Sequence, residues 1–170
     1  MALILSGDAG ITFPVTAGSA SAVQASSARV LQVINATYST STSVSNATLV
    51  DTGLTATITP TSSSSKILIL VNQNGNTGNA STADVGMRIA LLRGASQIAL
   101  IDGVCAYAGA TGASTIGVGS ASINYLDSPA TTSATTYKTQ FANRSVGATG
   151  AVTTQNTSST SSITLLEIAA

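Results

Sequence analysis

The chain has 170 residues, which is room for one domain or two very small ones. Ser and Thr together fill 51 positions, charged residues make up only 7%, six basic against six acidic, and the chain has no His, no Trp and a single Cys. This composition excludes a zinc or haem site built on imidazole or clustered thiolates, a disulfide framework, and a basic patch for nucleic-acid phosphates.

The predicted elements are short runs of β-branched and apolar residues, separated by clusters of Gly, Ser, Asn and Thr. Residues 1–29 form a separate N-terminal segment, in which the Ala/Ser stretch at 20–29 predicts one short helical turn or a flexible joint. The clearest strands are expected at residues 30–38, 54–59, 66–73, 85–93, 97–101, 115–126, 136–143 and 162–168. Helical periodicity is nearly absent. The sequence therefore predicts an all-β fold, an antiparallel, jelly-roll-like β-sandwich over residues 30–170.

Turn signals separate several of these strands. Gly94 follows Arg93 and supplies the positive φ that a tight hairpin requires. Pro60 and Pro129 each end a strand, because proline cannot donate a ladder hydrogen bond. Residues 72–81 hold four Asn and two Gly and are expected to be an exposed loop. Residues 107–119 are rich in Gly and Ala and predict either another loop or an irregular strand.

The face pattern differs among the strands. In residues 85–91 the large apolar side chains fall on alternate positions, which is typical of a strand buried on one face. In residues 67–71 both faces are apolar, and the C-terminal run at 163–168 is similar. One face of each such strand meets the core of the sandwich, and we expect a neighbouring copy of the chain to cover the other.

Zero net charge and a mean hydropathy of +0.38 argue against a disordered chain, although 27 of the hydrophobic residues are alanines that bury little surface. A neutral, Thr-rich surface suits close association, so we expect an oligomer. No run approaches the roughly 20 apolar residues that span a bilayer, and we expect no membrane insertion.

The residues that could carry chemistry are isolated in the sequence. The carboxylates lie at Asp8, Asp51, Asp84, Asp102, Asp127 and Glu167. No two of them form an evident acid/base pair, and no Asp-x-Asp-x-Asp spacing indicates Ca²⁺. We expect Asp51, Asp102 and Asp127 to serve turns and strand ends, Cys105 to be an ordinary buried thiol, and Glu167 to be open to pairing with a Lys or Arg. The sequence thus predicts no catalytic, cofactor-binding or metal-ligating residue, and no enzyme.

Several segments carry a resemblance that spans most of the chain. They lie at residues 6–14, 30–33, 51–54, 58–60, 65–68, 92–94, 126–132, 137–138 and 165–170. The sequence resembles a group of short phage tail-fibre or virion structural proteins, common among phages of cyanobacteria and other aquatic bacteria. The resemblance implies an N-terminal attachment segment, a compact β-sandwich head, a homotrimer and a place in the virion. It implies no catalytic residue.

Three functions remain open at this point. The leading prediction is a homotrimeric tail fibre or adhesin tip that docks on other virion proteins through residues 1–29. Its loop tips at residues 72–81 and 107–112 would contact a host glycan. The alternative is a capsid decoration protein that stabilises the phage head. A small depolymerase that cleaves host polysaccharide is the third, and the lack of a paired-acid motif argues against it.

Overall fold

A computed structural model describes residues 4–6, 10–12, 29–80, 84–109, 114–145 and 150–169, with side chains described from Arg29 onwards. The strands are β1 (Ile4–Ser6), β2 (Gly10–Thr12), β3 (Val30–Tyr38), β4 (Thr42–Val44), β5 (Val50–Ile58), β6 (Lys66–Ala80), β7 (Val85–Arg93), β8 (Ser96–Ala108), β9 (Thr115–Asp127), β10 (Thr135–Asn143), β11 (Ala151–Thr154) and β12 (Ser161–Ile168). One 3₁₀ turn, η1 (Asn156–Ser158), precedes β12. In this described part of the chain, no helix is long and apolar enough to cross a membrane.

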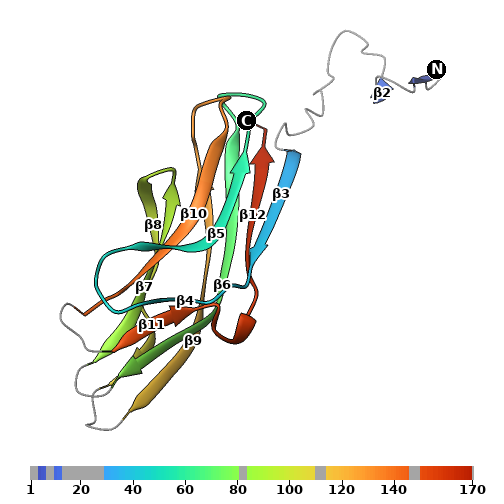
Figure 1. The fold of residues 1–170 in the computed structure, drawn as a ribbon. Helices are drawn as coiled ribbons and strands as arrows, with labels where there is room; N and C mark the ends of the chain where they lie inside the picture. Colours follow the sequence, from blue (N-terminus) through green and yellow to red (C-terminus); the bar gives the residue numbers. More distant parts are fainter. Residues whose placement is uncertain are drawn as a thin grey trace, which may run out of the picture.

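From β3 onwards the strands form two sheets that pack face to face (Figure 1). The smaller sheet has the order β5-β10-β7-β8, and the larger sheet contains β3, β12, β6, β11, β4 and β9. Every described pairing is antiparallel, and the chain passes repeatedly from one sheet to the other. The predicted all-β, antiparallel β-sandwich is therefore confirmed. Strands β1 and β2 pair with each other and lie outside both sheets.

The 15-residue strand β6 organises the larger sheet. Along one edge its first half pairs with β12, and its second half pairs with β11. Along its other edge, β9 pairs with almost its whole length. Strand β3 extends the sheet beyond β12, so the half near Lys66 has the strand order β3-β12-β6-β9.

The interior of the sandwich holds two apolar clusters. The first, around Leu54, Ile67 and Leu165, fills the half near the start of β6. The second, around Met87 and Phe141, fills the half near its end. The buried residues in both come mainly from alternate strand positions, because side chains one residue apart point to opposite faces of a sheet. The core therefore consists of two apolar clusters, and buried polar residues separate them midway along the strands.

The structure confirms most of the predicted elements, extends two strands and adds two short ones. The turn at Gly94 is confirmed, with a φ of 59° and the pair Arg93–Ser96 closing the hairpin. The expected loop at residues 72–81 is wrong, because β6 continues to Ala80. Strand β8 continues past Ile101 to Ala108. The short strands β4 and β11 were not predicted, since three or four polar and small residues give no periodic signal.

The division between residues 1–29 and 30–170 remains a prediction. The sandwich does begin with β3, at Val30. The helical turn or joint expected at residues 20–29 lies outside the described residues, apart from Arg29.

Candidate functional site

The segment expected to be a receptor loop is instead a buried polar belt. Gln73 is fully buried, and its Nε2 donates to Thr154 Oγ1 at 2.7 Å and to Ser161 Oγ at 3.1 Å. Thr139 Oγ1 donates to Gln73 Oε1 at 3.0 Å, which ties the larger sheet to the smaller one. Thr154 Oγ1 donates to Asn76 Oδ1 at 2.9 Å. Because these amides find hydroxyl partners on neighbouring strands, an Asn-rich run can lie inside the sandwich.

The buried polar belt also explains why the composition of residues 72–81 wrongly predicts a loop. The register of β6 against β9 shifts between Gln73 and Asn76, where Gly75 has a φ of 64°. Such a bulge favours glycine, and Gly beside Asn usually indicates a turn. Here the same residues form an irregularity inside a continuous strand, and the expected contact surface at 72–81 is removed from solvent except at alternate positions.

Cys105 is an ordinary buried thiol, as predicted. It is 7% exposed, and burial raises its pKa, although Asn76 Nδ2 donates a 3.5 Å hydrogen bond to its Sγ. The Asp102 carboxylate accepts a 2.7 Å hydrogen bond from the backbone N–H of Val104, which confirms its predicted local backbone role. Neither residue presents a nucleophile or a base to solvent in an arrangement suited to catalysis.

Glu167 is fully buried and, among the described residues, has neutral partners rather than the Lys or Arg considered from the sequence. Gln32 Nε2 donates to Oε2 at 2.6 Å, and the backbone N–H and hydroxyl of Thr61 each donate to Oε1 at 2.7 Å. Burial raises the pKa of this carboxyl, but these donors outweigh burial and hold the pKa at about 2. The carboxylate therefore joins β3, the 59–65 loop and β12.

Asp127 joins the two sheets at the same end of the sandwich. Arg93 Nη1 donates to both carboxylate oxygens at 3.0 and 2.9 Å, and Tyr137 Oη donates to Oδ2 at 2.6 Å. Burial and the hydrogen bond to Asp127 raise the pKa of the Tyr137 phenol. Asp127 is the last residue of β9, so its predicted strand-end position is confirmed, and its hydrogen-bond partners lie across the sandwich rather than in the adjacent turn.

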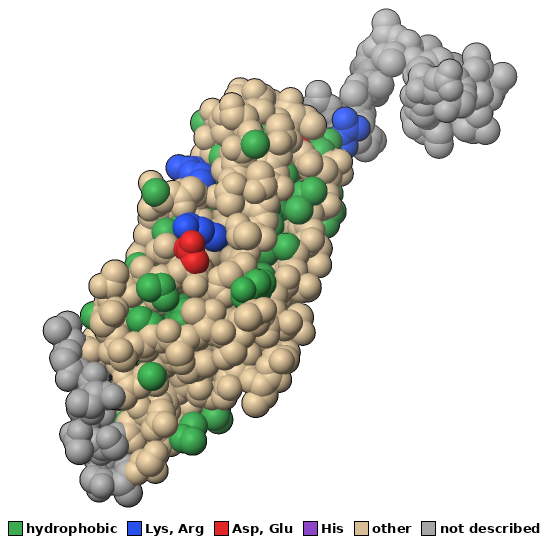
Figure 2. Space-filling model, in the orientation of Figure 1, with side chains coloured by type: hydrophobic (Ala, Val, Ile, Leu, Met, Phe, Trp, Pro, Cys, Tyr) green, Lys and Arg blue, Asp and Glu red, His purple; other side chains and the backbone are tan. Residues whose placement is uncertain are grey.

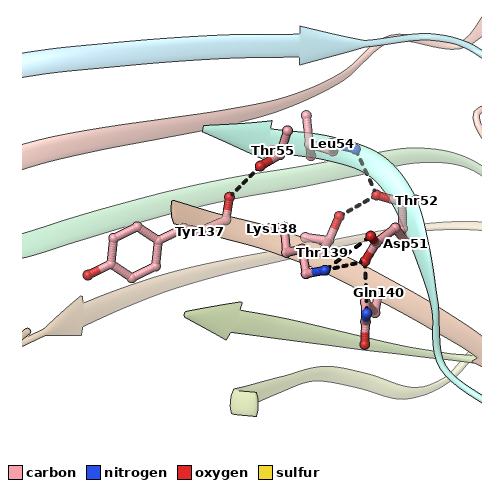
Figure 3. A network of polar contacts seen from close by, with 8 residues as sticks. All are labelled: Asp51, Thr52, Leu54, Thr55, Tyr137, Lys138, Thr139 and Gln140. Atoms are coloured by element: carbon pink, nitrogen blue, oxygen red, sulfur yellow. Dashed lines mark hydrogen bonds and ion pairs between the residues drawn. The ribbon is translucent and has the colours of Figure 1, made fainter. Parts of the chain in front are cut away.

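Asp51 lies on the outer face of the smaller sheet (Figure 3). Its carboxylate accepts hydrogen bonds from Lys138 Nζ at 3.0 Å and from Gln140 Nε2 at 2.8 Å. Burial raises the pKa of Asp51, and these two donors lower it below its usual value. A shallow depression of about 120 Å³ lies beside this group and is also lined by Gly53 and Thr55. The Asp51 carboxylate therefore has hydrogen-bond partners within the protein. They lie on the neighbouring strand β10, whereas the sequence predicted a role at the strand end.

The described carboxylates thus lie in separate settings, each with its own partners. In the described ranges, no group of three or more Cys, Asp and Glu side chains could hold a metal ion. Asp8 lies outside them. The arrangement of the described carboxylates suits structural hydrogen bonding, and the expectation that the chain is not an enzyme remains a prediction.

The strongest candidate for an external contact is the distal tip, which we define as Asn79, Asp84, Tyr107, Ser114 and Arg144. Tyr107 is 47% exposed, its Oη donates to Asp84 Oδ2 at 2.7 Å, and this bond raises the pKa of the phenol. The guanidinium carbon of Arg144 lies 5.6 Å from the centre of the Tyr107 ring, within range of a cation–π contact. Ser114 Oγ donates to Asn79 Oδ1 at 3.1 Å. The tip therefore presents an aromatic ring among polar and charged groups.

The position of the distal tip is set by the strands. It lies where β6 and β8 end and β7 and β9 begin, opposite the end where β3 starts and β12 finishes (Figure 1). Val30 and Ile168 lie in register with each other and Ile168 with Lys66, the first residue of β6. Fifteen strand residues span about 50 Å. Each of the two predicted contact segments includes one tip residue, Asn79 in 72–81 and Tyr107 in 107–112, while residues 81 and 110–112 lie outside the described part.

No protein-family model matches the chain, and no curated protein matches it. Among solved structures, it is similar to a chain in "Structure of infectious bursal disease virus Gt strain", with 14% sequence identity and a TM-score of 0.33. The match covers 99% of this chain, which spans about half of that chain, 47% of its length. A TM-score of 0.33 is too low to support an argument about function.

Proposed function

We propose that the chain is a non-enzymatic structural protein of a phage virion, a homotrimeric tail fibre or adhesin tip that contacts the host surface. The observation that supports this proposal is that the start of the sandwich and the distal tip lie at opposite ends of it. The chain enters at Val30, at one end, and the distal tip lies at the other end of β6, about 50 Å away. A module attached through residues 1–29 would therefore hold the tip away from its point of attachment.

The chemistry of the distal tip suits a glycan on the host surface. The face of an aromatic ring packs against the C–H groups of a sugar, and charged and amide side chains bond its hydroxyls. Tyr107 supplies the ring, and Asp84, Arg144 and Asn79 supply polar groups around it. These side chains are mounted on strand ends of a rigid sandwich, which keeps the entropy cost of binding low.

The test is adsorption of phage particles that carry Tyr107→Ala. We expect adsorption to the host to fall at least about tenfold, since an aromatic contact contributes on the order of 1–2 kcal/mol at each of three tips. Thr57→Ala is the matched control, because Thr57 is exposed on the outer face of the smaller sheet, away from the tip. Adsorption that is unchanged in Tyr107→Ala and in Arg144→Ala would contradict a contact at the tip.

Two further measurements separate the other functions. The copy number of the protein in purified particles should be that of a tail component, a few dozen or fewer. A copy number in the hundreds, as for a protein bound across the capsid lattice, would instead indicate a capsid decoration protein. Incubating the purified protein with host polysaccharide should release no new reducing ends. Their release would establish a depolymerase and overturn the non-enzymatic proposal.

A further inference from the structure

One row of side chains on the outer face of the larger sheet is entirely apolar. The register pairs Val33 with Leu166, Leu166 with Leu68, and Leu68 with Leu126, across β3, β12, β6 and β9. Paired residues in adjacent strands point to the same face. We call these four residues the apolar row. It crosses all four strands that form this half of the sheet.

The apolar row is open to solvent in the single chain, most of all at its two ends. Val33 is 56% exposed and Leu126 is 52% exposed, at the two edges of this half of the sheet. Leu70, in the next row, is 37% exposed. An apolar patch of this kind on an ordered sheet marks a contact surface.

The surroundings of the apolar row favour a second copy of the chain over a charged partner. In the next two rows the outer-face residues are Asn35, Thr164, Leu70 and Asn124, then Thr37, Ser162, Asn72 and Ser122. None of them is charged, and Lys66 lies on the opposite side of the apolar row, at the margin. Such a face offers nothing to complement a charged partner, and it meets the same face of another copy without repulsion. An apolar centre with a polar, uncharged margin is also the usual composition of an interface between subunits.

The size of the face determines how much of it a subunit contact must use. Four strands about 4.8 Å apart and eight residues rising about 3.3 Å each cover a projected area of about 500 Å². The accessible area of a corrugated face is larger than its projection, and a standard interface takes about 800 Å² from each partner. The apolar row alone is smaller than this, so the polar rows beside it must take part.

The width of the face also allows three copies to close around an axis. Four strands are about 19 Å wide, and an equilateral triangle with that side has its centre about 5.5 Å from each face. This is close to half of the roughly 10 Å that separates packed sheets. Three such faces therefore enclose a space that their own side chains can fill, with the β3 edge of each copy beside the β9 edge of the next.

We infer that three copies pack these outer faces around a threefold axis, with Leu68 and Leu166 toward the axis and Val33 of each copy against Leu126 of the next. The inference rests on the homotrimer of the proposed function and specifies which surface forms it. It also names a contact between different residues, as a closed ring requires.

Disulfide cross-linking tests the contact. The double variant Val33→Cys/Leu126→Cys, oxidised in solution, should give a covalent trimer on a denaturing gel, because each copy can bond to both neighbours. Each single variant should give no covalent trimer. Thr57→Cys/Gln97→Cys, two exposed positions on the smaller sheet, is the matched control and should remain monomeric on the gel. Cys105 is buried and present in every variant.

A charge placed in the row gives a second readout that does not depend on disulfide geometry. Leu126→Lys, at an exposed position, should leave the circular dichroism spectrum unchanged and reduce the native mass from trimer to monomer at micromolar concentration, whereas Thr57→Lys should remain a trimer. A folded wild-type monomer at that concentration overturns the inference, and so does a trimer that keeps its mass in Leu126→Lys. A trimer that cross-links as expected but is absent from purified particles would overturn the proposed function and leave the interface standing.

Discussion

The two outer faces of the sandwich differ in how far their neighbouring side chains cover the apolar residues. On the smaller sheet, the register places Leu92 between Lys138 and Gln97, and Leu92 is only 4% exposed. The stems of long polar side chains can cover apolar neighbours while their ends remain in water. On the larger sheet the apolar row consists of Val33, Leu166, Leu68 and Leu126, with no long polar side chain in the row, and its ends stay open.

On the smaller sheet the central apolar residue is covered, and the exposed apolar side chains, Leu100 at 50% and Val104 at 44%, lie on the edge strand β8. On the larger sheet an apolar row crosses four strands and is exposed at both ends. The view in Figure 2 shows a surface that is mostly uncharged and polar, with hydrophobic side chains scattered over it and a few charged ones. Charged residues are few in both sheets: the smaller sheet holds Asp51, Arg88, Arg93, Asp102 and Lys138, and the larger sheet holds Lys66, Asp127 and Glu167. The two sheets also differ in which residues the register places in one row.

The largest effect is expected at Gly53 in the smaller sheet, where the register of β5 against β10 shifts between Lys138 and Gln140. Gly53 has a φ of 89°, and a Cβ there would overlap the ring of Tyr38. Gly53→Ala should lower the free energy of unfolding by about 3 kcal/mol, from backbone strain plus overpacking. Chemical denaturation measures it. Gly94→Ala is the control, because Gly94 also has a positive φ, 59°, but no atom lies within 4 Å of the added Cβ. An equal loss in both variants would mean that backbone strain alone acts and the Tyr38 contact does not.

The next effect concerns the open face and depends on protein concentration. If three copies cover the apolar row, unfolding is coupled to dissociation, and a hundredfold dilution should lower the Tm by about 5 °C. Differential scanning fluorimetry of the wild type and of Leu126→Lys measures this. The variant's Tm should not depend on concentration. A wild-type Tm that is constant over the same concentration range would show that the protein unfolds as a monomer and would contradict the trimer.

A smaller effect is expected at Glu167, which holds β3 and β12 together beside the apolar row. Glu167→Gln should cost about 1.5 kcal/mol at pH 7, because a charged acceptor of three hydrogen bonds is lost. Its folded pKa of about 2 lies below the usual 4.5, so this stabilisation is present above pH 4.5 and is lost as the pH falls toward 2. The difference between the two proteins should therefore shrink across that range in acid denaturation. A difference that stays constant with pH would show that the carboxylate charge contributes nothing.

The smallest effect is expected on the outer face of the smaller sheet. The Asp51 side chain is 56% exposed, and its Oδ1 lies 2.8 Å from Lys138 Nζ. Asp51→Asn should change the free energy of unfolding by less than about 1 kcal/mol and leave the assembly intact, because exposed ion pairs contribute little and are screened by salt. Native mass and denaturation at low and high salt check both points. Loss of the trimer in this variant would mean that the smaller sheet also forms an interface.

Much of the fold could be predicted from residue patterns. Alternation in 85–91 and the two-sided apolar runs at 67–71 and 163–168 correctly indicated strands, and Gly94 and Pro60 correctly marked their ends. The Asn-rich end of β6 could not be predicted, because its amides are satisfied by Thr139, Thr154 and Ser161, which are distant in sequence. No local signal distinguishes an amide that will find such partners from one that will face water.

The candidate site was predictable only in part. Tyr107 stood in a Gly/Ala-rich segment and could be singled out as an exposed aromatic residue. Its partners, Asp84 and Arg144, are 23 and 37 residues away and carried no signal of their own. Sequence also could not show that Asp127, expected to form hydrogen bonds at a turn or strand end, would contact Arg93 and Tyr137 across the sandwich.

By itself the sequence determined the class of the fold, strands with one or two apolar faces and a chain without net charge, because these follow from side-chain period and residue type. The tertiary structure decided which residues share a row, a tip or a buried network. Those groupings depend on strand register and on sheet packing, which bring together residues far apart in the chain, and it is register that aligns four apolar residues in one row across the larger sheet.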